Sequence, residues 1–423
     1  MKKVLIIGLG RSSSVLIDYF LDYAEKNSIY IVLLDQHPNS YLKNLKKTPL
    51  CSQVFFDIYD KEKRSFQIRE ADLVISMLPP RFHALIAKDC IYFKKNLVTA
   101  SYVSDEMLSL DQKAKDSDIL ILNEIGLDPG IDHISAMKII NSLKNKGANI
   151  LSFKSFCGGL IAPESSDNPW DYKFTWNPRN VVLAGKDGAK YLKDGSVKKI
   201  EYKDVFSHTE KVSFPQYGLF ESYANRDSLH YIKKYDLENI QTLIRGTLRR
   251  TGFCSSWNIL VQLGLTSFLE GDLMSIEKEY HTIINKEQNL KVLNNLKYLD
   301  LFNSNKNFDF KSPGDFLQKR LEKKWSLSKN DKDMIVMQHQ FEYQINQAKY
   351  RLISSMTLLG TDDIRTAMAK TVGLPVFFAA KLILEGKTTL KGVRIPVYEE
   401  FYSPILKSLE KEGISFLETI ETV

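Results

Sequence analysis

The first candidate for chemistry is a glycine turn near the amino terminus, Gly8-Leu9-Gly10-Arg11-Ser12-Ser13, which follows a short apolar run. Its spacing is G-x-G-x-x-S, one substitution away from the dinucleotide-binding fingerprint G-x-G-x-x-G. Gly8 would allow the tight turn, Gly10 the approach of a pyrophosphate, and Ser13 is still small enough for close helix packing. Free N–H groups at the helix start would face the phosphates. We therefore predict a dinucleotide site; the alternative is a structural turn. The predicted contacts are Gly8, Gly10, Arg11, Ser12 and Ser13.

Two acidic residues end the next two apolar runs. Asp35 follows Gly10 by 25 residues, where a carboxylate can accept hydrogen bonds from ribose hydroxyls and would repel a 2′-phosphate. It favours NAD over NADP, and the alternative is a solvated acid at a strand end. Asp57 ends the third run and could reach the adenine end of a cofactor or cap a turn.

Polar residues also end the fourth and fifth runs, in Ser76-Met77-Leu78-Pro79-Pro80 and Thr99-Ala100-Ser101-Tyr102. Ligands of open α/β sheets bind outside the carboxyl ends of the strands. We predict that Ser76, Met77 and Ser101 contact the cofactor and that Ser101 and Tyr102 reach a substrate, although any one of them could be plain loop.

The elements that must position these residues follow from apolar periodicity. Residues 1–125 alternate strand-length apolar runs with amphipathic segments, which predicts repeated βαβ units in a doubly wound Rossmann-like domain. A helix opens at Asp128-Pro129-Gly130 and ends near Gly147. Alternating stretches then predict antiparallel strands of a mixed α/β domain, over 126–254 and 331–365, with a helical insertion at 255–330. The alternating stretches are Ile150 to Cys157, Met334 to Tyr343 and Tyr350 to Leu358.

Composition excludes several classes of protein. The formal charge of +7 is mild for 423 residues, and no basic stripe with interleaved aromatics predicts nucleic-acid binding. None of the four cysteines (Cys51, Cys90, Cys157, Cys254) forms a C-x-x-C pair, which fits a reducing compartment. The first apolar run is too short for a signal peptide, and no run approaches 18 apolar residues. We expect a cytoplasmic protein without a membrane span. The sequence leaves the oligomeric state open, with a homodimer as one candidate.

Longer segments resemble the saccharopine reductase family, the glutamate-forming saccharopine dehydrogenases. The match runs in the family's order over nearly the whole chain, although the last 55 residues match loosely and Ala224 stands where the family often has proline. The matching segments are Asn123 to His133, Ser155 to Leu160, Ala162-Pro163-Glu164, Asp167-Asn168-Pro169, Tyr172 to Trp176, Asn225 to Ser228, Ile244 to Arg249 and Met337-Gln338-His339.

The resemblance implies an NAD(P)-dependent oxidoreductase of lysine metabolism that acts on a secondary amine. Saccharopine, oxidised cofactor and water would give L-glutamate and 2-aminoadipate 6-semialdehyde. It also implies that the segment from about 366 to 423 packs back onto the dinucleotide domain. In fungal relatives the second strand leads into an arginine suited to NADP. Asp35 departs from that pattern, which favours an NAD-linked, degradative role.

The reaction itself asks for proton shuttling and positioning more than for a covalent nucleophile. Guanidinium groups suit the three substrate carboxylates, and family motifs select Arg226 and Arg245, helped by Gly246 and Thr247; the alternative for each arginine is a surface ion pair. Asp128 would contact the substrate amine or a water, or only cap a helix. Tyr102 would hydrogen-bond substrate, and Cys157 would be a polar neighbour of the site or a core residue. Leu127 and Trp176 are further cofactor candidates.

Metal chemistry is not expected. Asp132 and His133 resemble half a metal site without a third ligand, and His339 lies in a predicted strand, so we interpret both histidines as structural. Two rival functions stay open: a related oxidoreductase that couples an amine to an aldehyde in polyamine synthesis, as carboxynorspermidine synthase does, and a non-catalytic dinucleotide-binding regulator.

Overall fold

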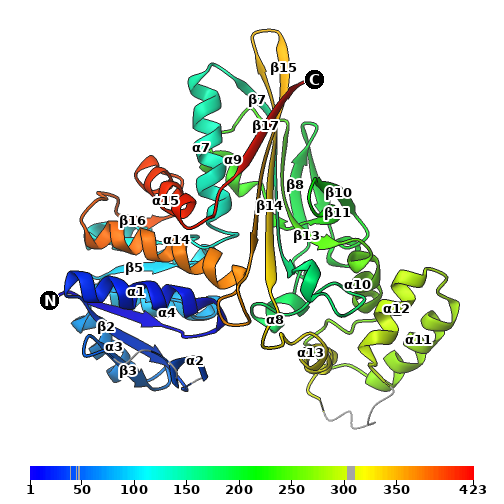
Figure 1. The fold of residues 1–423 in the computed structure, drawn as a ribbon, viewed down its shortest axis with the longest axis horizontal. Coiled ribbons are helices and arrows are strands. Elements are labelled where there is room, and N and C mark those ends of the chain that lie inside the picture. Colours follow the sequence, from blue (N-terminus) through cyan, green and yellow to red (C-terminus); the bar gives the residue numbers. More distant parts are fainter. Residues whose placement is uncertain (39, 44, 46–47, 303–309) are drawn as a thin grey trace. The chain divides into compact units, whose positions relative to one another are not determined.

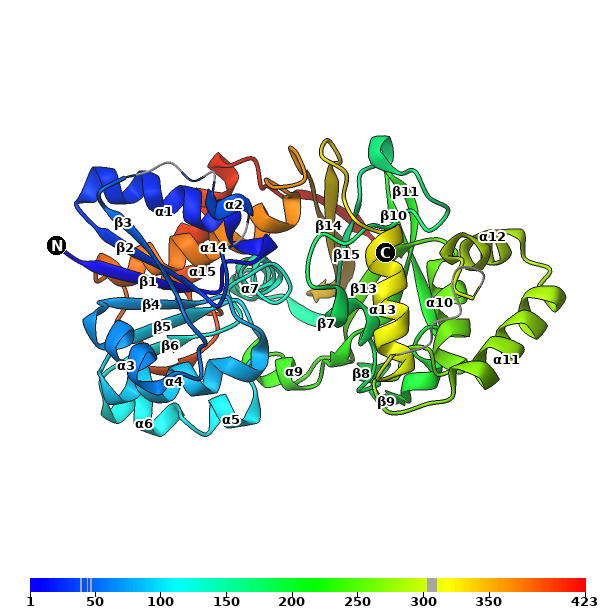
Figure 2. The ribbon, with the colours of Figure 1, turned by 90° about the horizontal axis from the view of Figure 1, so that it is seen from below.

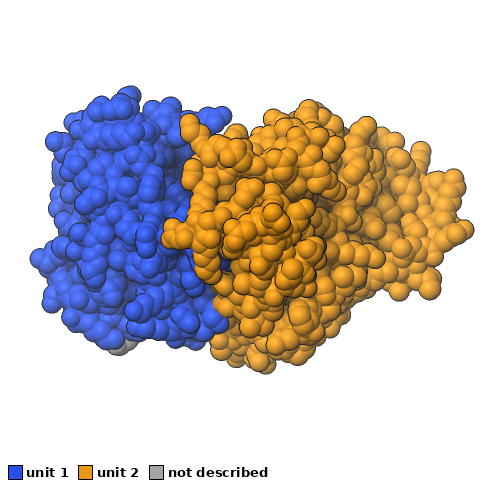
Figure 3. Space-filling model, turned by 90° about the horizontal axis from the view of Figure 1, so that it is seen from above, with its two compact units in different colours: residues 1–142, 364–415 blue, residues 143–363, 416–423 orange. Residues whose placement is uncertain are grey.

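The computed structural model describes all residues except 39, 44, 46–47 and 303–309. The chain forms two compact units, coloured separately in Figure 3. Unit 1 comprises residues 1–142 and 364–415, and unit 2 comprises residues 143–363 and 416–423. Each unit is organised around its own sheet.

The sheet of unit 1 is parallel throughout, in the order β16-β6-β5-β4-β1-β2-β3. Its central strands are continuous apolar runs that are buried, as a sheet covered on both faces requires. The order of β3 to β6 about β1 is that of a doubly wound dinucleotide fold, which confirms the predicted fold class. The strands are β1 (Lys3–Ile7), β2 (Tyr30–Asp35), β3 (Cys51–Phe55), β4 (Leu73–Ser76), β5 (Asn96–Thr99), β6 (Leu120–Leu122) and β16 (Gly392–Arg394).

Helices cover both faces of this sheet, with α1 and α14 on one side and α3 and α4 on the other (Figure 2). In α14 the ring of Phe377 lies edge-on to three rings of α1, at 5.0 to 5.7 Å between centroids. The helices of this unit are α1 (Ser14–Asn27), α2 (Ser40–Lys43), α3 (Lys61–Glu70), α4 (His83–Tyr92), α5 (Asp105–Leu108), α6 (Asp111–Asp116), α14 (Ala367–Leu384) and α15 (Glu399–Lys411).

Among the described residues, α14 alone has the length and apolar composition that a membrane crossing requires. Within the protein, 78% of that helix is buried, as in the core helix of a globular unit, and it carries Pro375 in its interior.

The boundaries between the two units differ from the predicted domain boundaries. Helix α7 (Ile131–Asn145) lies with unit 1 up to residue 142, and Asn141 Nδ2 donates to Tyr402 Oη of α15 at 3.0 Å. Residues 364–415 belong to unit 1, where β16 pairs with β6. The last strand, β17 (Leu417–Thr422), instead pairs with β15 of unit 2. The expected return of the whole segment to 423 is therefore wrong for its last eight residues, because β15 offers them a free sheet edge.

Unit 2 holds a mixed sheet in the order β10-β11-β13-β7-β14-β15-β17, visible in Figure 1 as the long strands β7, β14 and β15. Only the β13–β7 pairing within this order is parallel. The three predicted strands are present, within β7 (Asn149–Ile161), β14 (Asp333–Ile345) and β15 (Ala348–Leu359). The others are β8 (Ala189–Lys193), β9 (Ser196–Ile200), β10 (Thr209–Phe214), β11 (Gly218–Ala224), β12 (Arg226–Asp227) and β13 (Thr242–Arg250).

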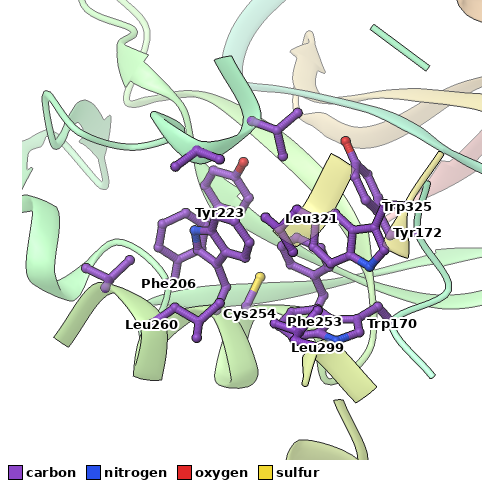
Figure 4. Packing of buried hydrophobic residues seen from close by; sticks show 14 of the residues in the cluster. Trp170, Tyr172, Phe206, Tyr223, Phe253, Cys254, Leu260, Leu299, Leu321 and Trp325 are labelled. Atoms are coloured by element: carbon purple, nitrogen blue, oxygen red, sulfur yellow. The ribbon is translucent and has the colours of Figure 1, made fainter. Parts of the chain in front are cut away.

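The helices of unit 2 enclose an aromatic cluster, shown in Figure 4. Trp170, Trp257 and Trp325 are buried there with Phe253 and Tyr172, and ring centroids lie 5.1 to 6.2 Å apart. The helices are α8 (Pro178–Val182), α9 (His230–Lys234), α10 (Phe253–Gln262), α11 (Leu273–Lys286), α12 (Leu290–Leu299) and α13 (Pro313–Lys324).

Candidate active site

The glycine turn follows β1 directly, and its two glycines differ in what surrounds them. Gly8 has a φ of +91°, and a Cβ there would lie 2.8 Å from Leu78 N, so no other residue fits. Beside Gly10 there is open space within 4 Å, as an approaching ligand would need. Arg11, Ser12 and Ser13 then form one 3₁₀ turn ahead of α1. The Ser13 hydroxyl is used locally, because it donates to Gly10 O at 2.7 Å.

Asp35 is tied to this turn through its carboxylate. Oδ2 accepts the Leu9 N–H at 2.6 Å and Oδ1 accepts the Gln36 N–H at 2.6 Å. Asp57 accepts the Tyr59 N–H at 2.9 Å, so it does cap a turn, and its contact with the adenine end of a cofactor stays a prediction.

The carboxyl ends of β4 and β5 are connected by a residue that sequence reasoning missed. His83, the first residue of α4, has its Nδ1 2.9 Å from Ser76 Oγ and its Nε2 2.8 Å from Ser101 Oγ. Burial lowers the pKa of this imidazole to about 4. Two of the predicted cofactor contacts, Ser76 and Ser101, are therefore held by one side chain.

Next to Ser101, Tyr102 donates its hydroxyl proton to Asp128 Oδ1 at 2.9 Å. The structure thus brings two predicted catalytic residues together. Helix α7 begins at Ile131, three residues after Asp128, and a capping role of Asp128 toward this helix stays a prediction. The adjacent Leu127 is buried beside Asp128. A carboxylate and a phenol in contact can hold or pass a proton.

A buried pair, Glu124 and His133, holds the loop that carries Tyr102. Glu124 Oε1 accepts the Val103 N–H at 3.0 Å, and its Oε2 lies 2.8 Å from His133 Nε2. Both residues are at most 1% exposed. His133 therefore has the structural role that was predicted. Within the part of the chain that is described, no group of three His, Cys, Asp or Glu residues is placed to hold a metal ion.

Unit 2 carries the predicted carboxylate-binding residues on or beside β13. Arg245 is 3% exposed, and its guanidinium carbon lies 4.4 Å from the centre of the Tyr231 ring. Arg226 is exposed with a φ of +56°, and the preceding Asn225 N donates to Arg245 O at 2.8 Å. The backbone thus ties the two arginine segments together.

Two glycines on neighbouring strands of unit 2 lie where no side chain would fit. A Cβ on Gly246 would lie 2.4 Å from Ser222 Oγ, and one on Gly158 would lie 2.8 Å from Leu248 O. Strand packing fills both places, so Gly158 lets β7 approach β13 closely, and a backbone contact of Gly246 with substrate stays a prediction. Cys157 itself is 6% exposed and pairs with Thr247 across these strands.

A second residue that was not selected from the sequence is Arg249, which is 4% exposed. Its guanidinium carbon lies 5.1, 5.8 and 5.2 Å from the ring centres of Tyr172, Tyr223 and Phe253. Nη1 donates to Leu248 O, Nη2 lies 3.4 Å from Tyr223 Oη, and Nε has no partner. Among the described residues no carboxylate pairs with it.

The strand period could have identified Arg249. Residues two apart on a strand point to the same face, which groups Arg245, Thr247 and Arg249. Trp176, a predicted cofactor contact, packs in unit 2 against the aromatic cluster, and its role toward a cofactor stays a prediction.

Comparison with known proteins extends this picture. Two family models match the chain, the saccharopine dehydrogenase NADP binding domain at residues 4–122 and the saccharopine dehydrogenase C-terminal domain at residues 126–414. The chain belongs to the saccharopine dehydrogenase family. This confirms the resemblance, the dinucleotide domain at the amino terminus and the assignment to an oxidoreductase family that uses a nicotinamide dinucleotide.

Two members of the family match over nearly their full length, and a third is a longer protein. Saccharopine dehydrogenase [NADP(+), L-glutamate-forming] of Pyricularia oryzae is 34% identical over 99% of both chains. Apo saccharopine dehydrogenase (L-Glu forming) from Saccharomyces cerevisiae has a TM-score of 0.87 at 31% identity, covering all of both chains. The α-aminoadipic semialdehyde synthase of Arabidopsis thaliana is 35% identical, and the match spans 41% of that longer protein. The name of the Pyricularia oryzae enzyme specifies NADP(+), as do those of relatives from Schizosaccharomyces pombe and Saccharomyces cerevisiae, which does not support the predicted preference for NAD.

Proposed function

We propose that this chain is a glutamate-forming saccharopine dehydrogenase. It oxidises saccharopine, with a nicotinamide dinucleotide and water, to L-glutamate and 2-aminoadipate 6-semialdehyde. The observation that carries this proposal is the match of 99% of the chain to 99% of a fungal enzyme named for that reaction. No specific observation favours the polyamine-forming or the regulatory alternative.

The chemistry divides into redox and proton steps. A bound nicotinamide supplies the hydride acceptor. Hydride leaves the lysine ε-carbon of saccharopine only when the bridging nitrogen is neutral, so a proton must first be taken from the secondary amine. We assign this proton to the Asp128 carboxylate, with Tyr102 donating to it at 2.9 Å and holding its orientation. After the Asp128 proton has passed to solvent, the carboxylate can again take a proton, now from the water that adds to the substrate iminium carbon.

The substrate's carboxylates need cationic partners. The surroundings of Arg249 indicate that arginines of unit 2 supply them. A buried guanidinium that contacts rings, a carbonyl and a phenol, and whose Nε has no partner, lacks the anion that normally accompanies such a group. We propose that a carboxylate of saccharopine completes it, with Arg245 and Arg226 binding the others and Thr247 adding a hydroxyl.

We propose NAD as the preferred cofactor and lysine degradation as the direction. Asp35 ends β2 at the glycine turn, where a carboxylate repels a 2′-phosphate. The names of the fungal relatives point to NADP instead, and the two cofactors are therefore compared directly in the assay.

One spectrophotometric assay tests the function and the cofactor. NADH or NADPH formation is followed with saccharopine as the sole amine substrate, and carboxynorspermidine is offered in parallel. We expect turnover of saccharopine and a larger kcat/KM with NAD. Turnover of the polyamine alone would replace the proposal by the related oxidoreductase, and tight NAD binding without any turnover would favour the regulator.

A further inference from the structure

His83 occupies an enclosed position between the ends of two strands in unit 1. It is 3% exposed, and both of its ring nitrogens face serine hydroxyls at hydrogen-bonding distance, Ser76 Oγ at 2.9 Å and Ser101 Oγ at 2.8 Å. Ser76 ends β4 and is fully buried, while Ser101 follows β5 and is partly exposed. The imidazole thus lies between a fully buried serine and a partly exposed one.

The ring has one proton for these two contacts. Burial holds the pKa of His83 at about 4, so near neutral pH the imidazole has one N–H donor and one acceptor nitrogen. Thr99 Oγ1 lies farther away, at 3.5 Å from Nδ1 and 3.3 Å from Nε2, and accepts the Ser101 N–H. With the proton on Nε2, the buried Thr99 hydroxyl can donate to Nδ1 only at 3.5 Å, so we derive the tautomer from the two shorter serine contacts.

Ser76 decides the direction of the chain of hydrogen bonds. Within the described residues, His83 Nδ1 is the one partner of the Ser76 hydroxyl. If Nδ1 carried the proton, the Ser76 O–H would be buried without an acceptor, which is unfavourable. Ser76 therefore donates to Nδ1, the proton sits on Nε2, and Nε2–H donates to Ser101 Oγ. Ser101 Oγ then accepts a hydrogen bond from His83 Nε2–H, and its own hydroxyl proton can be donated to a ligand.

We propose that His83 is a positioning residue that sets Ser101 as a hydrogen-bond donor to a ligand oxygen at the carboxyl end of β5. The acceptor has the chemistry of a carboxylate or carboxamide oxygen, which saccharopine and the nicotinamide both contain. The inference rests on the proposed function and on the prediction from the sequence that Ser101 contacts a ligand.

Two amide variants test the two hydrogen bonds of the His83 ring separately. In His83→Gln the amide nitrogen reaches the place of Nε2 and can donate to Ser101, whereas in His83→Asn it reaches the place of Nδ1 and faces Ser76. We expect His83→Gln to keep most of the kcat/KM for saccharopine and His83→Asn to lose about tenfold, the effect of one hydrogen bond to a charged or polar ligand. His281→Gln, an exposed histidine on α11, is the matched control without effect.

Coupling to Ser101 separates positioning from general loss of structure. In a Ser101→Ala background, His83→Asn should cause little further loss, because its effect passes through that hydroxyl. A raised KM for saccharopine with unchanged cofactor binding would identify the substrate as the acceptor, and weaker cofactor binding would identify the carboxamide. Equal activity of both His83 variants and the wild type, or effects that multiply in the double variant, would overturn the proposal.

A measurement on the unmodified protein covers the case in which the variants do not fold. Nitrogen-15 NMR of labelled histidines, with His83 assigned from the spectrum of His83→Gln or from proximity to Ser101, reports the tautomer. Protonated Nε2 is expected, and protonated Nδ1 would refute the direction derived above. Absence of saccharopine turnover by the wild type would instead refute the proposed function and leave this readout standing.

Discussion

Replacing Arg249 by methionine should separate a substrate-binding role from a structural one. In the folded chain this guanidinium is 4% exposed and has no carboxylate partner among the described residues. If the guanidinium binds a carboxylate of the substrate, its removal should change the stability of the free enzyme little and weaken the binding of saccharopine strongly. If the guanidinium instead stabilises the fold through its three ring contacts, its removal should lower the stability of the free enzyme and leave the binding of saccharopine unchanged.

The magnitudes can be worked from its surroundings. Desolvation of a buried ion costs several kcal/mol, and three cation–π contacts return about 0.5 to 2 kcal/mol each. Methionine fills the space and packs well against rings, so the free energy of unfolding should change by less than about 2 kcal/mol. Two charge-assisted hydrogen bonds to a carboxylate are worth about 1.5 to 3 kcal/mol each. Their loss should lower kcat/KM for saccharopine by about 10² to 10⁴.

The assay pairs urea unfolding of the free enzyme with saccharopine titrations at saturating cofactor. Arg250→Met is the control, because the neighbouring Arg250 donates to Tyr217 O and stacks on Phe220. It should change the KM for saccharopine little. A loss of more than about 3 kcal/mol of stability in Arg249→Met, together with an unchanged KM, would show that Arg249 is structural and would refute the carboxylate assignment.

Three other predictions address separate parts of the site. Asp35→Ser should narrow the ratio of kcat/KM for NAD over NADP by about tenfold or more, because the charge that opposes a 2′-phosphate is lost; an unmoved ratio would remove the basis of the cofactor assignment. Arg226→Ala should raise the KM for saccharopine while cofactor binding, followed by fluorescence, stays the same, and an unchanged KM would take Arg226 out of the substrate's reach. His83 should also make stability depend on pH, because its pKa of about 4 in the folded chain lies below the unfolded value of 6.5. Its contribution is complete above about pH 6.5 and is lost as the pH falls toward 4, about 3 kcal/mol in all, so urea unfolding of His83→Gln should show a flatter profile there; identical profiles would contradict the shift.

Local signals in the sequence were sufficient for the dinucleotide half of the site. The glycine spacing, the apolar runs and the acid at the end of the second run all act within one βαβ unit, and β1, α1 and β2 have the predicted arrangement. Asp128 and Tyr102 were chosen separately, and the structure brings them within 2.9 Å.

Contacts between distant segments were not accessible in the same way. His83 follows a loop with no motif of its own, and it becomes interesting only when β4 and β5 are known to be neighbours with Ser76 and Ser101 at their ends. The glycines at 158 and 246 have a packing reason that depends on which strand lies beside them. For the same reason the sequence could not show that the chain's last strand pairs with β15.

The most direct test of the central claim is product analysis of saccharopine oxidation by the purified chain. The account predicts one glutamate for each reduced nicotinamide, with the semialdehyde as the other product, because hydride leaves the lysine ε-carbon. Formation of lysine and 2-oxoglutarate would mean that hydride leaves the other carbon on the nitrogen. That result, or no reduced cofactor at all, would contradict the account.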